Sequence, residues 1–186
     1  GYSALTADTT GIGSVAIGRA ALEAQNFTDG TASRNVAVGY HAGLSITVGT
    51  INTLIGGEAG DALTTGDSNV AVGYVALSAD TQGDRSVAIG AGALKTQNFT
   101  TATSVYNIGI GYDAGASVTT GTFNTLIGGL AGDALTTGST NVALGVQALT
   151  TEDTGQGAVA IGYQALYSQN YDGVSYNVAV GRNAGE

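Results

Sequence analysis

Apolar and polar positions recur along this chain in one short phrase: a small polar residue, two or three aliphatic residues and a glycine. SVAIG at residues 14–18, NVAVG at 35–39 and NTLIG at 52–56 are successive examples, and NVAVG returns at 177–181. The glycines that end the phrases are 17 to 21 residues apart, a period typical of stacked repeats. Aliphatic residues at the second and fourth positions have the two-residue period of a short strand. The pattern therefore predicts an all-β fold, a parallel β-solenoid of 17–21-residue coils.

The predicted strand is apolar on both of its faces. We expect the second and fourth residues, such as Val36 and Val38, to line the interior of the coil, and the middle residue to point outward. A strand that is apolar on both faces normally has both faces covered, so we predict that the small middle residues contact another chain. These residues are Ala16, Ala37, Leu54, Ala71, Ala88, Gly109, Leu126, Ala143, Ala160 and Ala179.

A longer period of 72 residues, or four coils, is nested over the first. GEAGDALTTG at 57–66 returns as GLAGDALTTG at 129–138, and QNFT at 25–28 returns as QNFT at 97–100 and QNYD at 169–172. The insertion that begins with this QN-aromatic phrase accounts for the longer coils. We therefore expect one continuous array over residues 1–186, taken from a longer chain.

Two polar columns accompany the strands. Asparagine opens most of the phrases, and stacked asparagines can hydrogen-bond from coil to coil as a ladder. Threonine recurs in a turn that ends in glycine, as at Thr64 and Thr136. A threonine column on a solenoid suits an ice-binding face, but the glycine that follows favours a turn, so ice binding is kept as the remote alternative.

Composition and charge narrow the function. The chain has no cysteine, 10% charged residues and a formal net charge of −9, which disfavours nucleic acid and anionic membranes as partners. No apolar run is long enough to span a membrane. The single histidine, His41, occupies a variable position and is expected at the surface. We predict no catalytic site, no cofactor and no metal site; turn carboxylates such as Asp61 and Asp133 could offer oxygens to calcium, but solvated turns are favoured.

The QN-aromatic insertions are the candidates for contact with an outside partner. Exposed aromatic rings beside amides suit a host glycan or protein, whereas rings folded back over the coil edge would be structural, and the second interpretation is favoured. The candidate contact residues are Asn26, Phe27, Asn98, Phe99, Asn170 and Tyr171.

Two families share these phrases. SVAIGRAAL at 14–22 and SVAIGAGAL at 86–94 resemble the head repeats of trimeric autotransporter adhesins, and LTTGDSNVAVGYVAL at 63–77 resembles the glycine-rich repeats of bacteriophage tail fibres. The resemblance covers essentially the whole chain. It implies a homotrimeric fibre in a virion that contacts the host, with the predicted chain–chain residues at the trimer interface. The alternative is a trimeric adhesin or filament on a bacterial surface.

Overall fold

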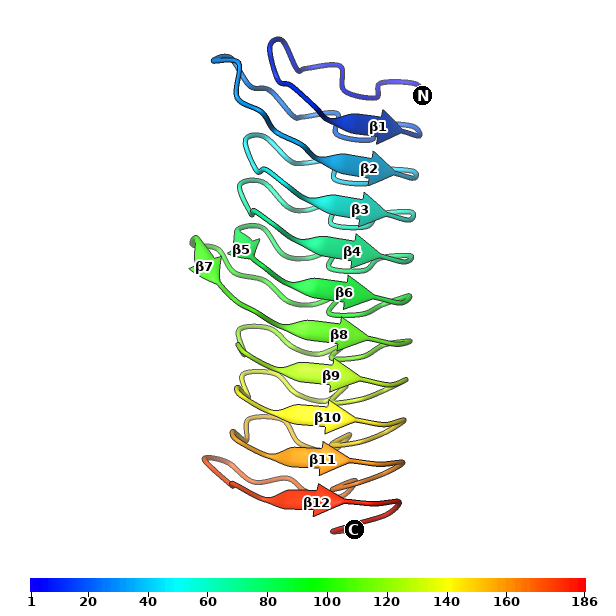
Figure 1. Cartoon of the computed structure of the whole chain (residues 1–186), viewed down its shortest axis with the longest axis vertical. Helices are drawn as coiled ribbons and strands as arrows, with labels where there is room; N and C mark the ends of the chain where they lie inside the picture. Colours follow the sequence, from blue (N-terminus) through cyan, green and yellow to red (C-terminus); the bar gives the residue numbers. More distant parts are fainter.

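The computed structural model describes all residues, 1–186, as an elongated stack of coils (Figure 1). Ten strands form one parallel sheet in the order β1-β2-β3-β4-β6-β8-β9-β10-β11-β12. The predicted fold class is confirmed: the chain is all-β and a solenoid. The structure holds no helix, and so none that could span a membrane.

Each phrase forms one strand of three residues. The strands of the long sheet are β1 (Val15–Ile17), β2 (Val36–Val38), β3 (Thr53–Ile55), β4 (Val70–Val72), β6 (Val87–Ile89), β8 (Ile108–Ile110), β9 (Thr125–Ile127), β10 (Val142–Leu144), β11 (Val159–Ile161) and β12 (Val178–Val180). Equivalent residues pair in register, so that Ala37 is opposite Leu54 and Leu54 is opposite Ala71. Ten strands spaced by about 4.8 Å give a sheet roughly 43 Å long.

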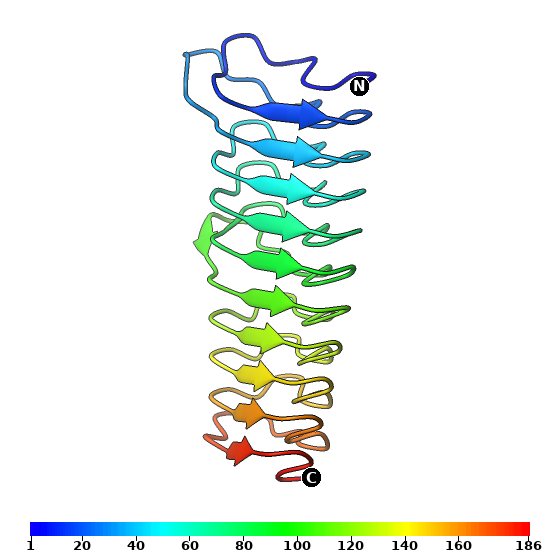
Figure 2. The ribbon, with the colours of Figure 1, turned by 45° about the vertical axis from the view of Figure 1, so that its right-hand side comes forward.

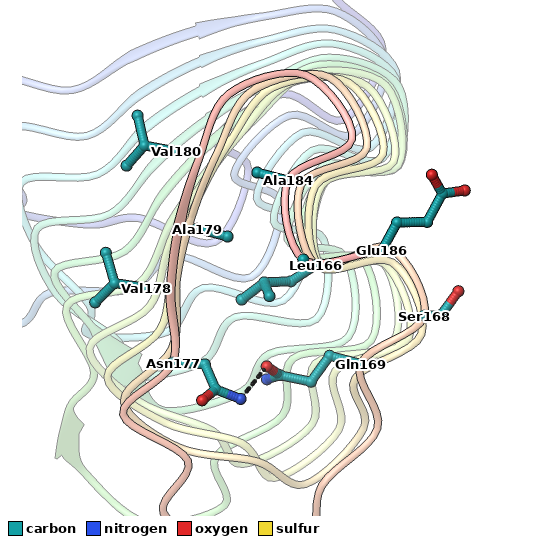
Figure 3. Close-up of a pocket in the computed structure, with 10 residues that line it drawn as sticks. Leu166, Ser168, Gln169, Asn177, Val178, Ala179, Val180, Ala184 and Glu186 are labelled. Carbon is teal, nitrogen blue, oxygen red and sulfur yellow. Dashed lines mark hydrogen bonds between the residues drawn. The ribbon is translucent and has the colours of Figure 1, made fainter.

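The predicted orientation of the strand residues is wrong. Middle residues such as Ala37 and Ala71 are fully buried in the core, whereas the flanking aliphatics are half-buried or exposed. Figure 3 shows this arrangement at β12, where Ala179 points toward Leu166 inside the coil while Val178 and Val180 point away. The residues predicted for the chain–chain interface therefore fill the interior, and the side chains predicted for the interior form the outer face.

The reason is that the narrow interior of the coil has little volume for the side chain of the middle residue. The other columns of the core are already filled by the alanine and leucine that follow each turn, such as Ala76 and Leu77. A middle leucine fits only where the neighbouring leucine is absent: a Cβ added at Gly43 would lie 2.7 Å from Leu54 Cδ1, and one at Gly60 would lie 2.8 Å from Leu54 Cδ2. Because interiors are close-packed, each of the two middle leucines lies between two glycines, Leu54 between Gly43 and Gly60 and Leu126 between Gly115 and Gly132.

The insertions form the only departures from the regular coil. β5 (Gly83–Asp84) and β7 (Thr103–Ser104) pair in parallel as a separate two-stranded sheet, and Gln156 forms an isolated bridge with Val174. The loops near residue 30, at β7 and near residue 172 project from the same edge of the stack (Figures 1 and 2). The insertions therefore interrupt neither the long sheet nor the register of its strands.

Candidate functional site

The outer face of the long sheet is an uninterrupted aliphatic surface, here called the aliphatic face. It consists of Val15, Ile17, Val36, Val38, Thr53, Ile55, Val70, Val72, Val87, Ile89, Ile108, Ile110, Thr125, Ile127, Val142, Leu144, Val159, Ile161, Val178 and Val180, all half-buried or exposed. Thr53 and Thr125 are its two polar residues, and it carries no charge. With strands three residues wide, the aliphatic face covers on the order of 400 Å², a size comparable to the largest apolar patch on a typical monomer, which is often functional.

The asparagine ladder predicted from the sequence is present inside the coil. Asn52 N–H donates to Asn35 Oδ1 and Asn69 N–H donates to Asn52 Oδ1, each at 2.9 Å. The amide group of Asn52 also donates to the carbonyl of Gly66 at 2.9 Å. Because these groups are buried, the ladder holds the start of each strand to the preceding coil and to the turn of the next one.

A carboxylate replaces an aliphatic core residue next to each insertion; Asp80 and Glu152 are buried and Asp8 is half-buried. Asp80 Oδ2 accepts from Gln97 Nε2 at 2.6 Å, and Gln97 Oε1 accepts from Asn107 Nδ2 at 2.9 Å. Asp80 Oδ1 also accepts the N–H groups of Gly83 and Phe99. The same relay recurs at Asp8, Gln25 and Asn35 and at Glu152, Gln169 and Asn177, and the last of these bonds is drawn in Figure 3. The sequence analysis missed this relay, although its signal, an acid 17 residues before each QN phrase, was visible.

Burial changes the acidity of several carboxyl groups. Desolvation raises the pKa of Asp80, Asp61 and Asp133 above its usual range. Desolvation also acts on Asp8 as its largest single influence, but hydrogen bonds from Gln25 and from the backbone at Gly11 and Phe27 together lower the pKa of Asp8. The pKa values of Asp80 and Asp8 therefore shift in opposite directions, because Asp80 is buried more deeply than Asp8.

We expect acidification from pH 7 toward pH 4.5 to raise the thermal midpoint of unfolding. Carboxyl groups with a raised folded-state pKa bind protons more readily when folded, so their stabilising effect is complete below the unfolded pKa of about 3.9 and is lost as the pH rises. Asp8 and Asp29, whose pKa is lowered, act in the opposite direction, and most of their stabilising effect is lost below about pH 4.5, outside this range. The measurement is thermal unfolding followed by circular dichroism across this pH range.

The double variant Asp61→Asn with Asp133→Asn is the control for this pH effect. The Oδ1 atoms of both residues are buried without a hydrogen-bond partner, so neutral amides should flatten the pH dependence and raise the midpoint at pH 7. A midpoint of the unmodified chain that falls steadily on acidification would contradict the prediction.

The three QN-aromatic insertions differ in the exposure of their aromatic rings. Phe27 and Phe99 are buried, with 5% and 8% exposed, whereas Tyr171 is 55% exposed. Asn26, Asn98 and Asn170 are all exposed, and Asn26 and Asn98 accept hydrogen bonds from threonines of the preceding coil. Two of the three aromatic rings are thus folded back into the protein, which leaves Tyr171 as the one candidate contact ring at the surface.

Sequence reasoning also missed an exposed stack beside the second insertion. The Tyr106 and Phe123 rings lie 5.7 Å apart and nearly parallel, and the Arg85 guanidinium lies over the Tyr106 ring at 5.7 Å. All three residues precede the polar residue that opens a phrase, and all have a positive φ. The left-handed backbone there directs three successive side chains outward in one column.

The remaining candidate residues offer no chemistry. The hydroxyls of Thr47 and Thr64 donate to carbonyls of the next coil, so this column is engaged within the protein. His41 is half-buried and stacks on Tyr40 at 3.7 Å. No group of three or more His, Asp or Glu side chains lies close enough together to hold a metal ion. The largest hollow, about 620 Å³, lies over the last coil between Leu166, Ala179 and Ala184 (Figure 3).

Comparison of the chain with protein-family models, with curated proteins and with solved structures found no match.

Proposed function

We propose that this chain is a structural segment of a virion fibre, a phage tail fibre, in which three parallel copies pack together and hold a host-binding tip away from the particle. The observation that carries the proposal is the aliphatic face. It runs the full length of the array without a charge, a composition typical of the buried centre of an interface. The number of copies, three, and the location in a virion are taken from the resemblance to tail-fibre repeats.

A second copy of the chain is the partner that fits the aliphatic face. Every copy has the same spacing of about 4.8 Å between coils, so parallel copies can match residue for residue along the whole sheet. The middle residues of the strands cannot take part in this contact, because they are buried inside each coil. The β-branched residues on either side of them, such as Val72 and Val87, make the contact instead.

The test of assembly is sedimentation velocity of the full chain and of the double variant Ile55→Lys with Ile89→Lys. Both isoleucines are exposed, so lysine can extend into solvent in a single chain but is buried without a partner charge in a trimer. We expect a trimer for the unmodified chain and a monomer with an unchanged circular dichroism spectrum for the variant. The matched control is Thr65→Lys with Thr137→Lys, in exposed turns. An unmodified chain that sediments as a monomer overturns the proposal.

A separate experiment must decide whether the fibre belongs to a phage particle or to a bacterial surface. Immunogold electron microscopy with antibodies to this chain should label fibres on phage particles. The SVAIG phrases favour a bacterial surface adhesin as the second candidate, and label confined to bacterial cells would support that candidate instead.

A further inference from the structure

Tyrosines stand on alternate coils along one corner of the solenoid. Tyr2, Tyr40, Tyr74 and Tyr112, here called the tyrosine row, each follow the glycine that ends a phrase, and all four are exposed. The coils between them carry Arg19, Gly57 and Ala91 at the same position. At the next alternate coil the residue is Val146, which ends the regular row.

Coil-to-coil hydrogen bonds fix the spacing of the row. The carbonyl of Tyr40 accepts from Glu58 N–H at 2.8 Å, and the carbonyl of Tyr74 accepts from Gly92 N–H at 3.0 Å. Two strand steps therefore separate successive tyrosines by about 9.6 Å. Because the backbone itself sets this distance, only the tyrosine rotamers have to be ordered when the row binds a ligand.

The small residues between tyrosines let a ring lie against the neighbouring coil. A Cβ added at Gly57 would lie 3.5 Å from Tyr74 Cδ2, so the Tyr74 ring lies close to the coil that carries glycine. Tyr74 and Tyr112 are 62% and 63% exposed. Large, rigid rings with this exposure and a hydroxyl at the tip are suited to a partner that has both an apolar face and hydroxyl groups.

We infer that the tyrosine row binds a linear, neutral polysaccharide with β-1,4 linkages. In such an extended chain alternate sugars present the same face, and the disaccharide repeat has about the length of two strand steps, ~9.6 Å. The C–H face of every second sugar can then pack on a tyrosine, while the sugar between spans the distance to the next ring. An α-linked chain curls and does not keep this straight repeat.

The charge around the row favours a neutral ligand. Glu58 lies one residue beyond the row position in its coil, and the whole chain carries a formal net charge of −9. The other charges near the row are Asp113, which is paired with Lys95 Nζ at 2.8 Å, and Arg19, which lies over the Tyr40 ring at 5.7 Å. The net negative field repels an anionic polymer, whereas the Glu58 carboxylate can accept hydrogen bonds from the hydroxyls of a neutral glycan. The inference goes beyond the proposed structural role, because it gives the fibre segment a ligand of its own.

The test is binding of cellohexaose and chitohexaose to the full chain by isothermal titration calorimetry. We expect Tyr74→Ala and Tyr112→Ala each to weaken binding about tenfold and the double variant to weaken it more strongly, because each removes one stacking surface. Tyr74→Phe should retain binding. The matched control is Tyr176→Ala, an exposed tyrosine outside the row.

Sedimentation of the same variants separates this inference from the assembly. Loss of the oligomer in the double alanine variant, with no oligosaccharide bound by the unmodified chain, would show that the row is a chain–chain contact and overturn the inference. Equal binding of α-linked dextran oligosaccharides would also overturn it. A monomeric unmodified chain whose binding depends on Tyr74 and Tyr112 would support the glycan site and refute the trimer.

Discussion

Alanine at Gly128 is expected to destabilise the solenoid by about 3 kcal/mol or more, among the largest effects of any single substitution. Gly128 has a φ of 137°, and an added Cβ would lie 2.5 Å from the carbonyl carbon of Gly145 in the next coil. Gly145 cannot move away, because its N–H donates to the carbonyl of Ile127 at 2.8 Å. The strained backbone and the clash with a hydrogen-bonded neighbour therefore add.

The adjacent glycine provides the control for this substitution. A Cβ at Gly129 would meet nothing closer than 4.0 Å, and its φ lies outside the left-handed region. We expect Gly129→Ala to change the free energy of unfolding by less than about 1 kcal/mol. Urea unfolding measures both variants, and similar values for the two would refute the steric account. Weakening a middle coil is also expected to make the stack unfold in two stages. The stability of a repeat array is the sum of the stabilities of its repeats and of the contacts between neighbouring repeats.

The coil and its register could be predicted from the sequence, because their signals are local. Glycine ends every phrase, and the return of Gly56, Gly73 and Gly90 at one spacing predicts in-register parallel strands. The asparagine ladder followed from the same stacking. Each of these predictions needs only the repeat itself and the geometry of a parallel sheet.

The direction of the strand faces could not be taken from alternation alone, because both faces are apolar. Val36 and Val38 are more hydrophobic than Ala37. This difference led to the wrong prediction that the valines line the interior of the coil. Packing volume decides the orientation instead, and the sequence did carry that signal. The two exceptional middle leucines, Leu54 and Leu126, coincide with coils in which glycine replaces leucine after the turn, as they must if they share one interior.

The exposure of the aromatic residue in each insertion could not be predicted from the QN-aromatic phrase. Phe27, Phe99 and Tyr171 occupy equivalent places, yet only Tyr171 is exposed. The relay acids beside Phe27 and Tyr171 hold both backbones in the same way, through hydrogen bonds from Phe27 N–H and Tyr171 N–H. The difference lies in the coil that follows: Asn26 N–H and Asn98 N–H donate to the carbonyls of Thr47 and Thr119 in the next coil, and residues 182–186 supply no such coil beside Tyr171.

Alanine at Asn124 is expected to destabilise the fold by about 3 kcal/mol, because it leaves two buried groups without partners. Asn124 Nδ2 donates to the carbonyl of Gly138 at 2.8 Å, and Asn124 Oδ1 accepts from Asn141 N–H at 2.9 Å. Neither group can reach water, since the ladder lies inside the coil. Urea unfolding at pH 7 measures the loss, and Asn177→Ala, at an exposed position, should cost less than about 1 kcal/mol.

Aspartate at the same position separates the two hydrogen bonds. Asn124→Asp keeps the oxygen that accepts from Asn141 but places a buried carboxylate against the Gly138 carbonyl, so at pH 7 it should be at least as damaging as alanine. A protonated carboxyl can donate to that carbonyl, so acidification should stabilise Asn124→Asp more than it stabilises the unmodified chain, whereas Asn124→Ala should keep the pH profile of the unmodified chain. If the two variants follow the same pH profile, the amide of Asn124 does not bridge the coils, and the stack depends on its backbone hydrogen bonds and apolar core alone.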